Sequence, residues 1–341
     1  MTLPRLGDYA ERVHFRGEDA SKSSNRPFNN GSAKNPPIVR SHGVNRILLY
    51  PGSFNPPHQG HLNLLRYVFE NAGEDLNIIG VIIIMTDENR LEDKLCQEEN
   101  PLILTRKKRV NLWRGDGIPV DWVWVYDRSE ASWADFRPRM AKEFSKDRLD
   151  VKFILLGGPD AISAEGTFNP KYWNCPDSIT SDISRPVDFR YPNTLRQLAG
   201  FSMWEKVSYD RRRLEQEIRA KMRGQPAQAI EQALARAFAT IGAVSICRRL
   251  RKPKGVIRFI PCNLEQRPND APSSTKIRQI IKTSPKDSLE DALKGIALNS
   301  KFLAEYIAKR PQLAQSTGKE KTKVEEKPVR DWYEVEKQIV W

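Results

Sequence analysis

The segment 52–61 brings together residue types that could bind and activate a phosphate. It reads Gly-Ser-Phe-Asn-Pro-Pro-His-Gln-Gly-His. His58 and His61 are three residues apart, so on one turn of a helix both imidazoles would face the same way. There they could donate hydrogen bonds to oxygens that gain charge while one phosphate attacks another. We therefore take His58 and His61 as the candidate catalytic residues, acting by electrostatic stabilisation and not as nucleophiles.

The residues around this segment predict a strand before it and a helix after it. Apolar residues 47–50 end at a Pro-Gly pair, as a buried strand does, and apolar residues recur at helical spacing from Leu62. At such a turn Gly52 would let an anion approach the backbone, and the amides of Ser53 and Phe54 could point at it. The alternative is that the histidines are ordinary surface or capping residues. The complete pattern at a strand-to-helix turn favours a phosphate site.

Strands and helices are predicted to alternate along much of the chain. Strands are expected at 47–50, 78–85, 122–126, 151–156, 243–247 and 256–260, and helices at 105–113, 133–144 and 214–241. Strands that alternate with helices favour an α/β fold. We expect a Rossmann-like, doubly wound parallel sheet of about six strands, with helices on both faces and a helical insertion.

Composition separates the ends of the chain from a folded centre. Residues 16–45 are rich in Ser, Asn, Pro and Gly and lack apolar periodicity, which is typical of flexible chain. The alternation breaks after residue 160, and residues 168–192 are loop-like. We therefore expect a flexible leader (1–45), a folded domain (46–310) with a partly helical insertion (162–241), and a charged tail (311–341).

Charge and cysteine content narrow the partners and the compartment. A formal net charge of +13 with 29% charged residues suits polyanionic partners, either phosphate-rich small molecules or nucleic acids. The four cysteines form no CxxC pair, so neither a zinc knuckle nor a disulfide framework is predicted. The start of the chain lacks the pattern of a signal peptide, and no apolar run is long enough to span a bilayer. We expect a cytoplasmic or nuclear protein without a membrane partner, and a homo-oligomer is left open.

Two later segments could also bind an anion. In 272–278, Pro-Ser-Ser-Thr-Lys-Ile-Arg, Ser273 or Ser274 can cap a helix whose first amides receive an anion, and Arg278 adds a fork of donors. A plain capped helix with a surface arginine is the alternative. In 155–160, Leu-Leu-Gly-Gly-Pro-Asp, a Gly-Pro-Asp turn follows a strand, although turn chemistry alone also favours these residues.

These three segments, in this order, resemble the motifs of the His-x-Gly-His nucleotidyltransferase superfamily, also called cytidylyltransferase-like. The first segment is most similar to nicotinamide/nicotinate mononucleotide adenylyltransferases. The resemblance implies ATP as substrate with Mg²⁺, attack of a substrate phosphate on the α-phosphorus, release of pyrophosphate, and a place in NAD biosynthesis. The sequence itself shows no carboxylate cluster that would bind a metal ion without the nucleotide, so no metal-ligating residue is predicted. The resemblance assigns nucleotide binding to Gly52, Ser53, Phe54, Gly158, Asp160, Ser273, Thr275 and Arg278.

The acceptor site is less clearly marked. Family members of the mononucleotide type usually follow the second strand with a basic loop, whereas residues 86–94 are largely acidic here, which leaves Lys94 as the candidate for binding the acceptor phosphate. Trp122, Trp124 or Trp133 could stack on a pyridine ring, although tryptophans in an alternating strand are often packing residues.

Other functions fit parts of the same pattern. A CTP-dependent cytidylyltransferase acting on an alcohol phosphate would use the same chemistry. A nucleotide-binding regulatory protein, or a weak ATPase without an acceptor, would keep the triphosphate site only. The acidic loop and the insertion motivate this last alternative.

Three basic runs, at 106–109, 211–213 and 248–252, could form a nucleic-acid surface. No RNA-binding module accompanies them, so solvated helix faces are favoured and nucleic acid is not expected as a partner. Within these runs, Arg109 could lie near the active site and Arg248 could meet the triphosphate.

Overall fold

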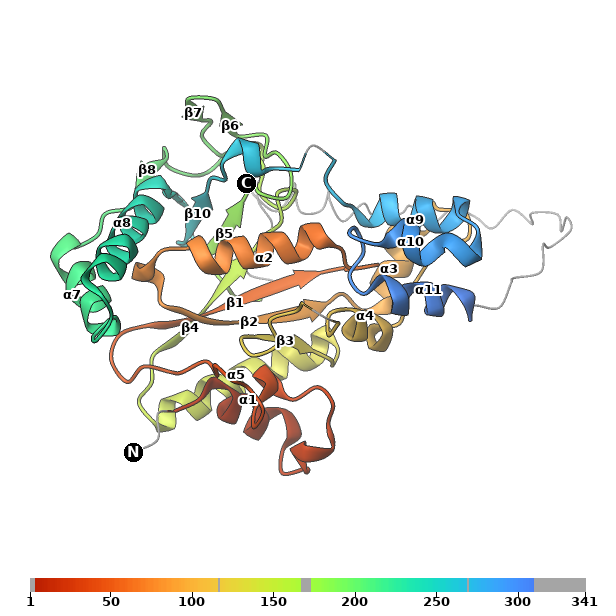
Figure 1. Ribbon diagram of the computed structural model, residues 1–341, viewed down its shortest axis with the longest axis horizontal. Coiled ribbons are helices and arrows are strands. Elements are labelled where there is room, and N and C mark those ends of the chain that lie inside the picture. The colour runs from red at the N-terminus through yellow and green to blue at the C-terminus, as the bar shows by residue number, and fades with distance from the viewer. Residues whose placement is uncertain (1–3, 116, 167–172, 269, 310–341) are drawn as a thin grey trace, which may run out of the picture.

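A mostly parallel sheet of eight strands forms the centre of the protein (Figure 1). This computed structural model describes residues 4–115, 117–166, 173–268 and 270–309, and within them the strand order is β3-β2-β1-β4-β5-β10-β9-β8. The parallel strands are β1 (Asn45–Gly52), β2 (Ile78–Met85), β3 (Val123–Tyr126), β4 (Val151–Leu156), β5 (Ser178–Ser181) and β10 (Val256–Ile260). Antiparallel strands β9 (Ser245–Arg248) and β8 (Glu205–Lys206) complete one edge, and β6 (Arg190–Tyr191) pairs separately with β7 (Thr194–Leu195).

Helices cover both faces of the sheet, which confirms the predicted α/β, Rossmann-like, doubly wound fold. α2 (Gln59–Asn71) and α4 (Arg106–Leu112) pack on one face, while α1 (Leu6–Phe15) and α5 (Glu130–Lys146) pack on the other. The remaining helices are α3 (Glu88–Leu95), α7 (Arg211–Lys221), α8 (Ala227–Ala243), α9 (Ser274–Thr283), α10 (Leu289–Leu293) and α11 (Ser300–Ala308). Short 3₁₀ turns lie at Ala20–Lys22, Pro27–Asn29, Glu74–Leu76, Leu264–Gln266 and Lys286–Ser288.

Strand β1 lies at the centre of this arrangement. Its side chains alternate, with Leu48 and Tyr50 in the core beneath α2 and with Ile47 and Leu49 in the core beneath α1 and α5. β1 pairs in parallel with β2 on one side and with β4 on the other. The carboxyl ends of β1 and β4 therefore form the switch point at which doubly wound sheets bind ligands.

The N-terminal residues are part of the folded protein, so the prediction of a flexible leader was wrong for residues 4–45. Helix α1 buries Leu6, Tyr9 and Val13 against α5. The polar stretch that follows is also packed, since the buried Asn25 amide donates to the Val125 carbonyl oxygen over 2.8 Å. Buried asparagines that bond to the backbone give this stretch the composition of a loop while it forms a structural layer.

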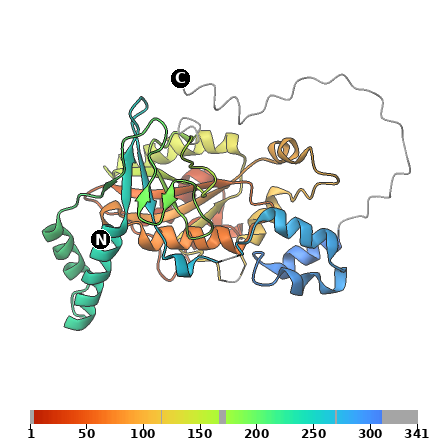
Figure 2. The same ribbon diagram turned by 90° about the horizontal axis from the view of Figure 1, so that it is seen from above.

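The predicted insertion contains a strand of the central sheet. β5 lies between β4 and β10, and all four of its residues are buried. Residues 168–192 were predicted to be loop-like because Ser178, Thr180 and Ser181 hide the apolar character of this strand, and residues 167–172 lie outside the described ranges. The helical part is confirmed as two helices, α7 and α8, which project from one end of the molecule, while α9 to α11 lie at the other end (Figure 2).

Two further predictions concern the ends and the membrane. The charged tail predicted at 311–341 lies outside the described residues. No helix within the described ranges combines the length and the apolar character that crossing a bilayer requires.

Candidate active site

His58 and His61 lie together at the start of α2. His58 is the N-cap residue, and its backbone N–H donates to Nδ1 of His61 over 3.2 Å. The two rings stack with centroids 3.6 Å apart. Because Nδ1 of His61 accepts this bond, the proton of its neutral imidazole is on Nε2. That nitrogen is the donor that His61 can offer to a phosphate oxygen.

Both histidines are held in the neutral form. Burial, together with the charge of Arg185, lowers the pKa of His58 to about 3. Burial, His58 and Arg185 hold the pKa of His61 well below its usual value. The His58 side chain is 3% exposed, and its Nδ1 has no hydrogen-bond partner within the described part of the chain. The pair therefore offers uncharged donors near neutral pH, one of which has an unused ring nitrogen.

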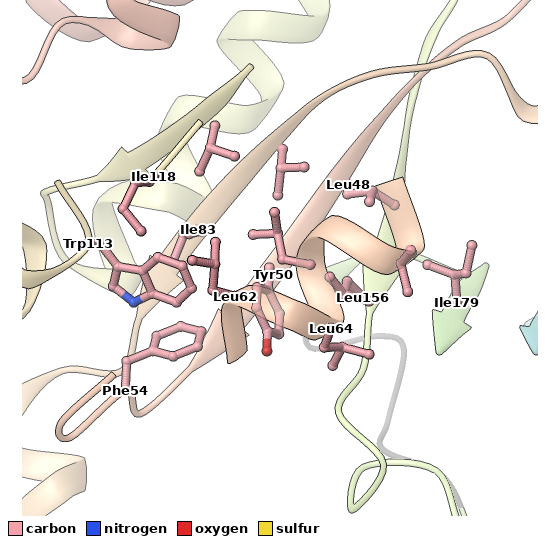
Figure 3. Packing of buried hydrophobic residues seen from close by; sticks show 14 of the residues in the cluster. Leu48, Tyr50, Phe54, Leu62, Leu64, Ile83, Trp113, Ile118, Leu156 and Ile179 are labelled. Atoms are coloured by element: carbon pink, nitrogen blue, oxygen red, sulfur yellow. The ribbon is translucent and has the colours of Figure 1, made fainter. Parts of the chain in front are cut away.

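The loop between β1 and α2 is fixed by the ring of Phe54. Phe54 has a φ of 45°, in the left-handed region, and its side chain is buried against Tyr50 and Trp113 (Figure 3). Its ring also makes an edge contact with the imidazole of His61. A Cβ on Gly52 would lie 2.7 Å from the Phe54 ring. Only glycine at position 52 leaves room for the Phe54 ring to pack on the end of β1. The Phe54 ring in turn supports the imidazole of His61.

Arg109 fixes the backbone at Ser53. Its side chain is fully buried, and its Nη1 donates to the carbonyl oxygens of Ser53 and Thr86 over 2.9 and 2.8 Å. Its Nε donates to the Leu104 carbonyl oxygen over 3.0 Å. In a trans peptide the C=O and the following N–H point in opposite directions, so the Phe54 N–H is turned away from Arg109. Arg109 lies beside the site, as the sequence suggested, but it holds the loop and does not face a ligand.

Helix α9 brings the second motif onto the same loop. The Ser274 hydroxyl donates to the Pro56 carbonyl oxygen over 2.9 Å, and Nη1 of Arg278 donates to the Asn55 carbonyl oxygen over 3.1 Å. Ser273 caps the helix by accepting from the Lys276 N–H over 3.1 Å. The first turns of α2 and α9 are therefore neighbours, although more than 200 residues separate them in the sequence.

Gly60 shows how closely these two helices approach, and Thr275 lies beside Arg278 in the first turn of α9. The Thr275 hydroxyl accepts from Nη2 of Arg278 over 3.2 Å. A Cβ on Gly60, between the two histidines, would lie 3.3 Å from the Pro272 carbonyl oxygen. Two helix N-termini and Arg278 thus converge beside the histidine pair, which is an arrangement that favours an anion with several charges.

Asp160 lies near the same place. It is paired with Arg185, a residue that the sequence analysis did not identify. Asp160 follows β4 and is 68% exposed, and its carboxylate forms a 2.7 Å ion pair with Arg185. The charge of Arg185 also contributes to the lowered pKa of both histidines. Arg185 was missed because its segment was interpreted as a loop. The available signal was its position four residues after β5, at the carboxyl edge of the sheet. Gly158 lies between the end of β4 and Asp160 and is partly exposed.

The acceptor candidates divide into one near the site and two away from it. Nζ of Lys94 lies 3.5 Å from the Ser53 hydroxyl. Trp124 is 1% exposed and packs in the core beneath α1, so the prediction that it stacks on a pyridine ring was wrong. Trp122 stacks on Phe69 at the opposite, amino end of β3, so it too was assigned wrongly.

Two other residues were considered from the sequence as ligand contacts. Trp133 lies in the core, and Arg248 lies at the surface. Trp133 is buried in the same core as Trp124. Arg248, which was considered as a triphosphate ligand, forms a 2.9 Å ion pair with Glu205 at the sheet edge.

Comparison with known proteins points to one family. Residues 49–280 match the family model described as cytidylyltransferase-like. A probable nicotinate-nucleotide adenylyltransferase of a Caulobacter species is 30% identical over 127 residues, which are 35% of this chain. The matched region spans 57% of that relative, just over half of its length.

Two solved structures of Plasmodium falciparum nicotinic acid mononucleotide adenylyltransferase also resemble this chain. The complex with NaAD has a TM-score of 0.37 and 12% identity, covering 77% of this chain and 96% of the other. The complex with APC has a TM-score of 0.36 and 12% identity, covering 76% and 95%.

Proposed function

This chain belongs to the cytidylyltransferase-like family, whose members are nucleotidyltransferases, and we propose that it transfers the adenylyl group of ATP to a pyridine mononucleotide. The products would be an NAD-type dinucleotide and pyrophosphate. The observation that carries the proposal is the convergence of the neutral histidine pair, the first turns of α2 and α9, and Arg278. The name of the Caulobacter relative favours nicotinate mononucleotide as the acceptor.

Each group at the site has a role in this reaction. A phosphate oxygen of the acceptor attacks the α-phosphorus of ATP, and the bond from that phosphorus to the oxygen bridging to the β-phosphate breaks. His61, through Nε2, and His58 donate to the oxygens that gain charge in this step. Ser273, Thr275 and Arg278 hold the β- and γ-phosphates, which leave as pyrophosphate. The two histidines are in place before the reaction, so no rearrangement of their rings opposes it.

Gly52, Ser53 and Phe54 contribute through the backbone. Arg109 binds the Ser53 carbonyl oxygen, and the Phe54 N–H points the other way, toward the nucleotide phosphates in this proposal. Gly158 and Asp160 are assigned to the nucleoside part of ATP because they follow the neighbouring strand, β4. Lys94 is assigned to the acceptor phosphate because it lies beside Ser53.

Magnesium would arrive with the nucleotide. Within the described ranges, no three His, Cys, Asp or Glu side chains gather closely enough to hold a metal ion. Phosphate oxygens and water are the ligands that Mg²⁺ prefers when a protein offers few of its own. Bound in this way, it would neutralise charge on the β- and γ-phosphates.

The test is pyrophosphate release by the purified protein with Mg²⁺. ATP and CTP are each paired with nicotinate mononucleotide, nicotinamide mononucleotide, phosphocholine and glycerol phosphate. We expect release only with ATP and a pyridine mononucleotide, faster with the nicotinate form. Release that requires CTP and an alcohol phosphate would contradict the proposal and favour a cytidylyltransferase. Release with none of the acceptors, from protein that binds ATP, would favour a nucleotide-binding regulatory protein.

A further inference from the structure

Arg278 binds a carboxylate of the protein itself. Its Nε lies 3.2 Å from Oε2 of Glu98, and its Nη2 lies 2.7 Å from Oε1. Glu98 therefore occupies two parallel donors of the guanidinium at once. The remaining terminal nitrogen, Nη1, is bound to the Asn55 carbonyl oxygen and holds the loop of the first motif.

The edge that Glu98 occupies is the edge that a phosphate would need. An arginine presents two parallel N–H groups that match a carboxylate and a phosphate in the same bidentate geometry. Nη1 donates to the Asn55 carbonyl oxygen and Nη2 also donates to the Thr275 hydroxyl, so the edge formed by Nε and Nη2 is the one that can face a charged ligand. Glu98 and a nucleotide phosphate thus compete for the same pair of donors.

Glu98 belongs to a segment that is held by an ion pair near each of its ends. The segment 87–100, which we call the acidic strap, contains α3 and the turn after it. At its start, Asp87 pairs with Arg106. At its end, Glu98 pairs with Arg278, and the Lys282 ammonium group donates to the Glu99 carbonyl oxygen over 3.4 Å. The strap is thus attached at its far end by α9, the helix that carries the second motif.

The Glu98 contact is suited to exchange. The Glu98 side chain is 30% exposed, so water can reach the carboxylate while it is bound, and the cost of releasing it is modest. The Arg278 side chain is 10% exposed, so its charge interacts strongly with whichever anion is present. A triphosphate with several negative charges can displace a single carboxylate from such a site.

We propose that Glu98 is an affinity-determining residue that occupies Arg278 in the free protein and is displaced when the triphosphate binds. The inference rests on the proposed function insofar as the natural ligand is a nucleotide. The competition itself concerns any polyphosphate. Glu98 accordingly weakens binding of polyphosphates and, because a monophosphate competes less well, discriminates in favour of the triphosphate.

The test is calorimetric binding of ATP and, separately, of inorganic tripolyphosphate, each with Mg²⁺, to the full chain and its variants. Glu98→Gln removes the charge and keeps the shape of the side chain, and Glu98→Ala removes the contact altogether. Glu99→Gln is the matched control, since it makes the same change of net charge on the adjacent, exposed side chain. The pair Glu98→Gln and Arg278→Gln is also combined, because the effect of Glu98 should require Arg278.

We expect both Glu98 variants to bind ATP and tripolyphosphate about three- to tenfold more tightly than the unaltered protein, as for release of one partly exposed ion pair. Glu99→Gln should change affinity less than twofold, and Glu98→Gln should have no effect in the Arg278→Gln background. Equal or weaker binding by variants that melt like the unaltered protein would overturn the proposal, as would an equal gain in Glu99→Gln. Tighter tripolyphosphate binding without turnover would support the competition and contradict the proposed function. Normal turnover without tighter binding would support the proposed function and contradict the competition.

Discussion

His61 lies directly against His58, with the two imidazole planes 23° apart and their centroids 3.6 Å apart. Two protonated rings at this separation would repel each other strongly, and burial disfavours charge on either ring. Arg185 acts in the same direction on both. The arrangement therefore selects two neutral donors, and their protonation can be used to test it.

Folding stability should fall as the pH falls from 6.5 toward 4.5, partly because of His58. The pKa of His58 is about 3 in the folded protein and about 6.5 in an unfolded chain, so in this window the unfolded state binds more protons. The stabilisation is fully present above pH 6.5 and is lost as the pH falls toward 3. In urea unfolding, His58→Gln should flatten this slope by on the order of 1 kcal/mol per pH unit. The exposed His42→Gln should leave the slope unchanged, and equal slopes for all three proteins would show that His58 is not held neutral.

Replacing Arg109 by lysine should destabilise the fold although the charge is kept. A lysine offers a single nitrogen where Arg109 uses both Nε and Nη1, so it cannot keep all three bonds, and buried acceptors without partners are costly. We expect the free energy of unfolding in urea to fall by about 2–4 kcal/mol. Arg212→Lys, on the exposed face of α7, is the matched control and should change it by less than about 0.5 kcal/mol. If the free energy of unfolding falls by a similar small amount in both variants, Arg109 does not hold the loop.

The N-terminal helix should contribute to global stability. Leu6 is fully buried between α1 and the rest of the core, so Leu6→Ala should cost about 2–5 kcal/mol of unfolding free energy. Glu18→Ala, on the exposed chain after the helix, should cost less than about 0.5 kcal/mol. Thermal melts of both variants distinguish a packed layer from a flexible leader. If Leu6→Ala melts at the same temperature as the unaltered protein, the interpretation of this segment as a flexible leader would be correct.

The sequence was sufficient to predict elements in which pattern and packing agree. β2, β4 and β10 were predicted residue for residue at 78–85, 151–156 and 256–260, and β1 and α5 were found at the expected positions. Their apolar periods are clear and turn residues bound them. The motif residues His58, His61, Ser273, Thr275 and Arg278 lie on the neighbouring first turns of α2 and α9, and their roles in nucleotide binding stay predictions. Their residue types are those that a strand-to-helix turn and a capped helix require for binding an anion.

The errors arose where tertiary contacts decide the role of a residue. β5 is rich in serine and threonine, and only its place between two strands makes it a core strand. Trp124 could be judged as a stacking or a packing residue only once its neighbours were known. Residues 86–94 were interpreted as a departure from a basic acceptor loop, but the pairing of Asp87 with Arg106 and of Glu98 with Arg278 could not be inferred from the sequence.

We propose that His61 stabilises the charge that develops during transfer, and a single turnover of ATP with nicotinate mononucleotide tests this role most directly. Pyrophosphate release is followed in His61→Ala, with the exposed His42→Ala as control, and ATP affinity is measured on the same preparations. We predict that His61→Ala lowers the rate by on the order of a hundredfold or more, while its ATP affinity changes by only a few-fold. If His61→Ala binds ATP and releases pyrophosphate at a rate within about threefold of the control, His61 does not have this role.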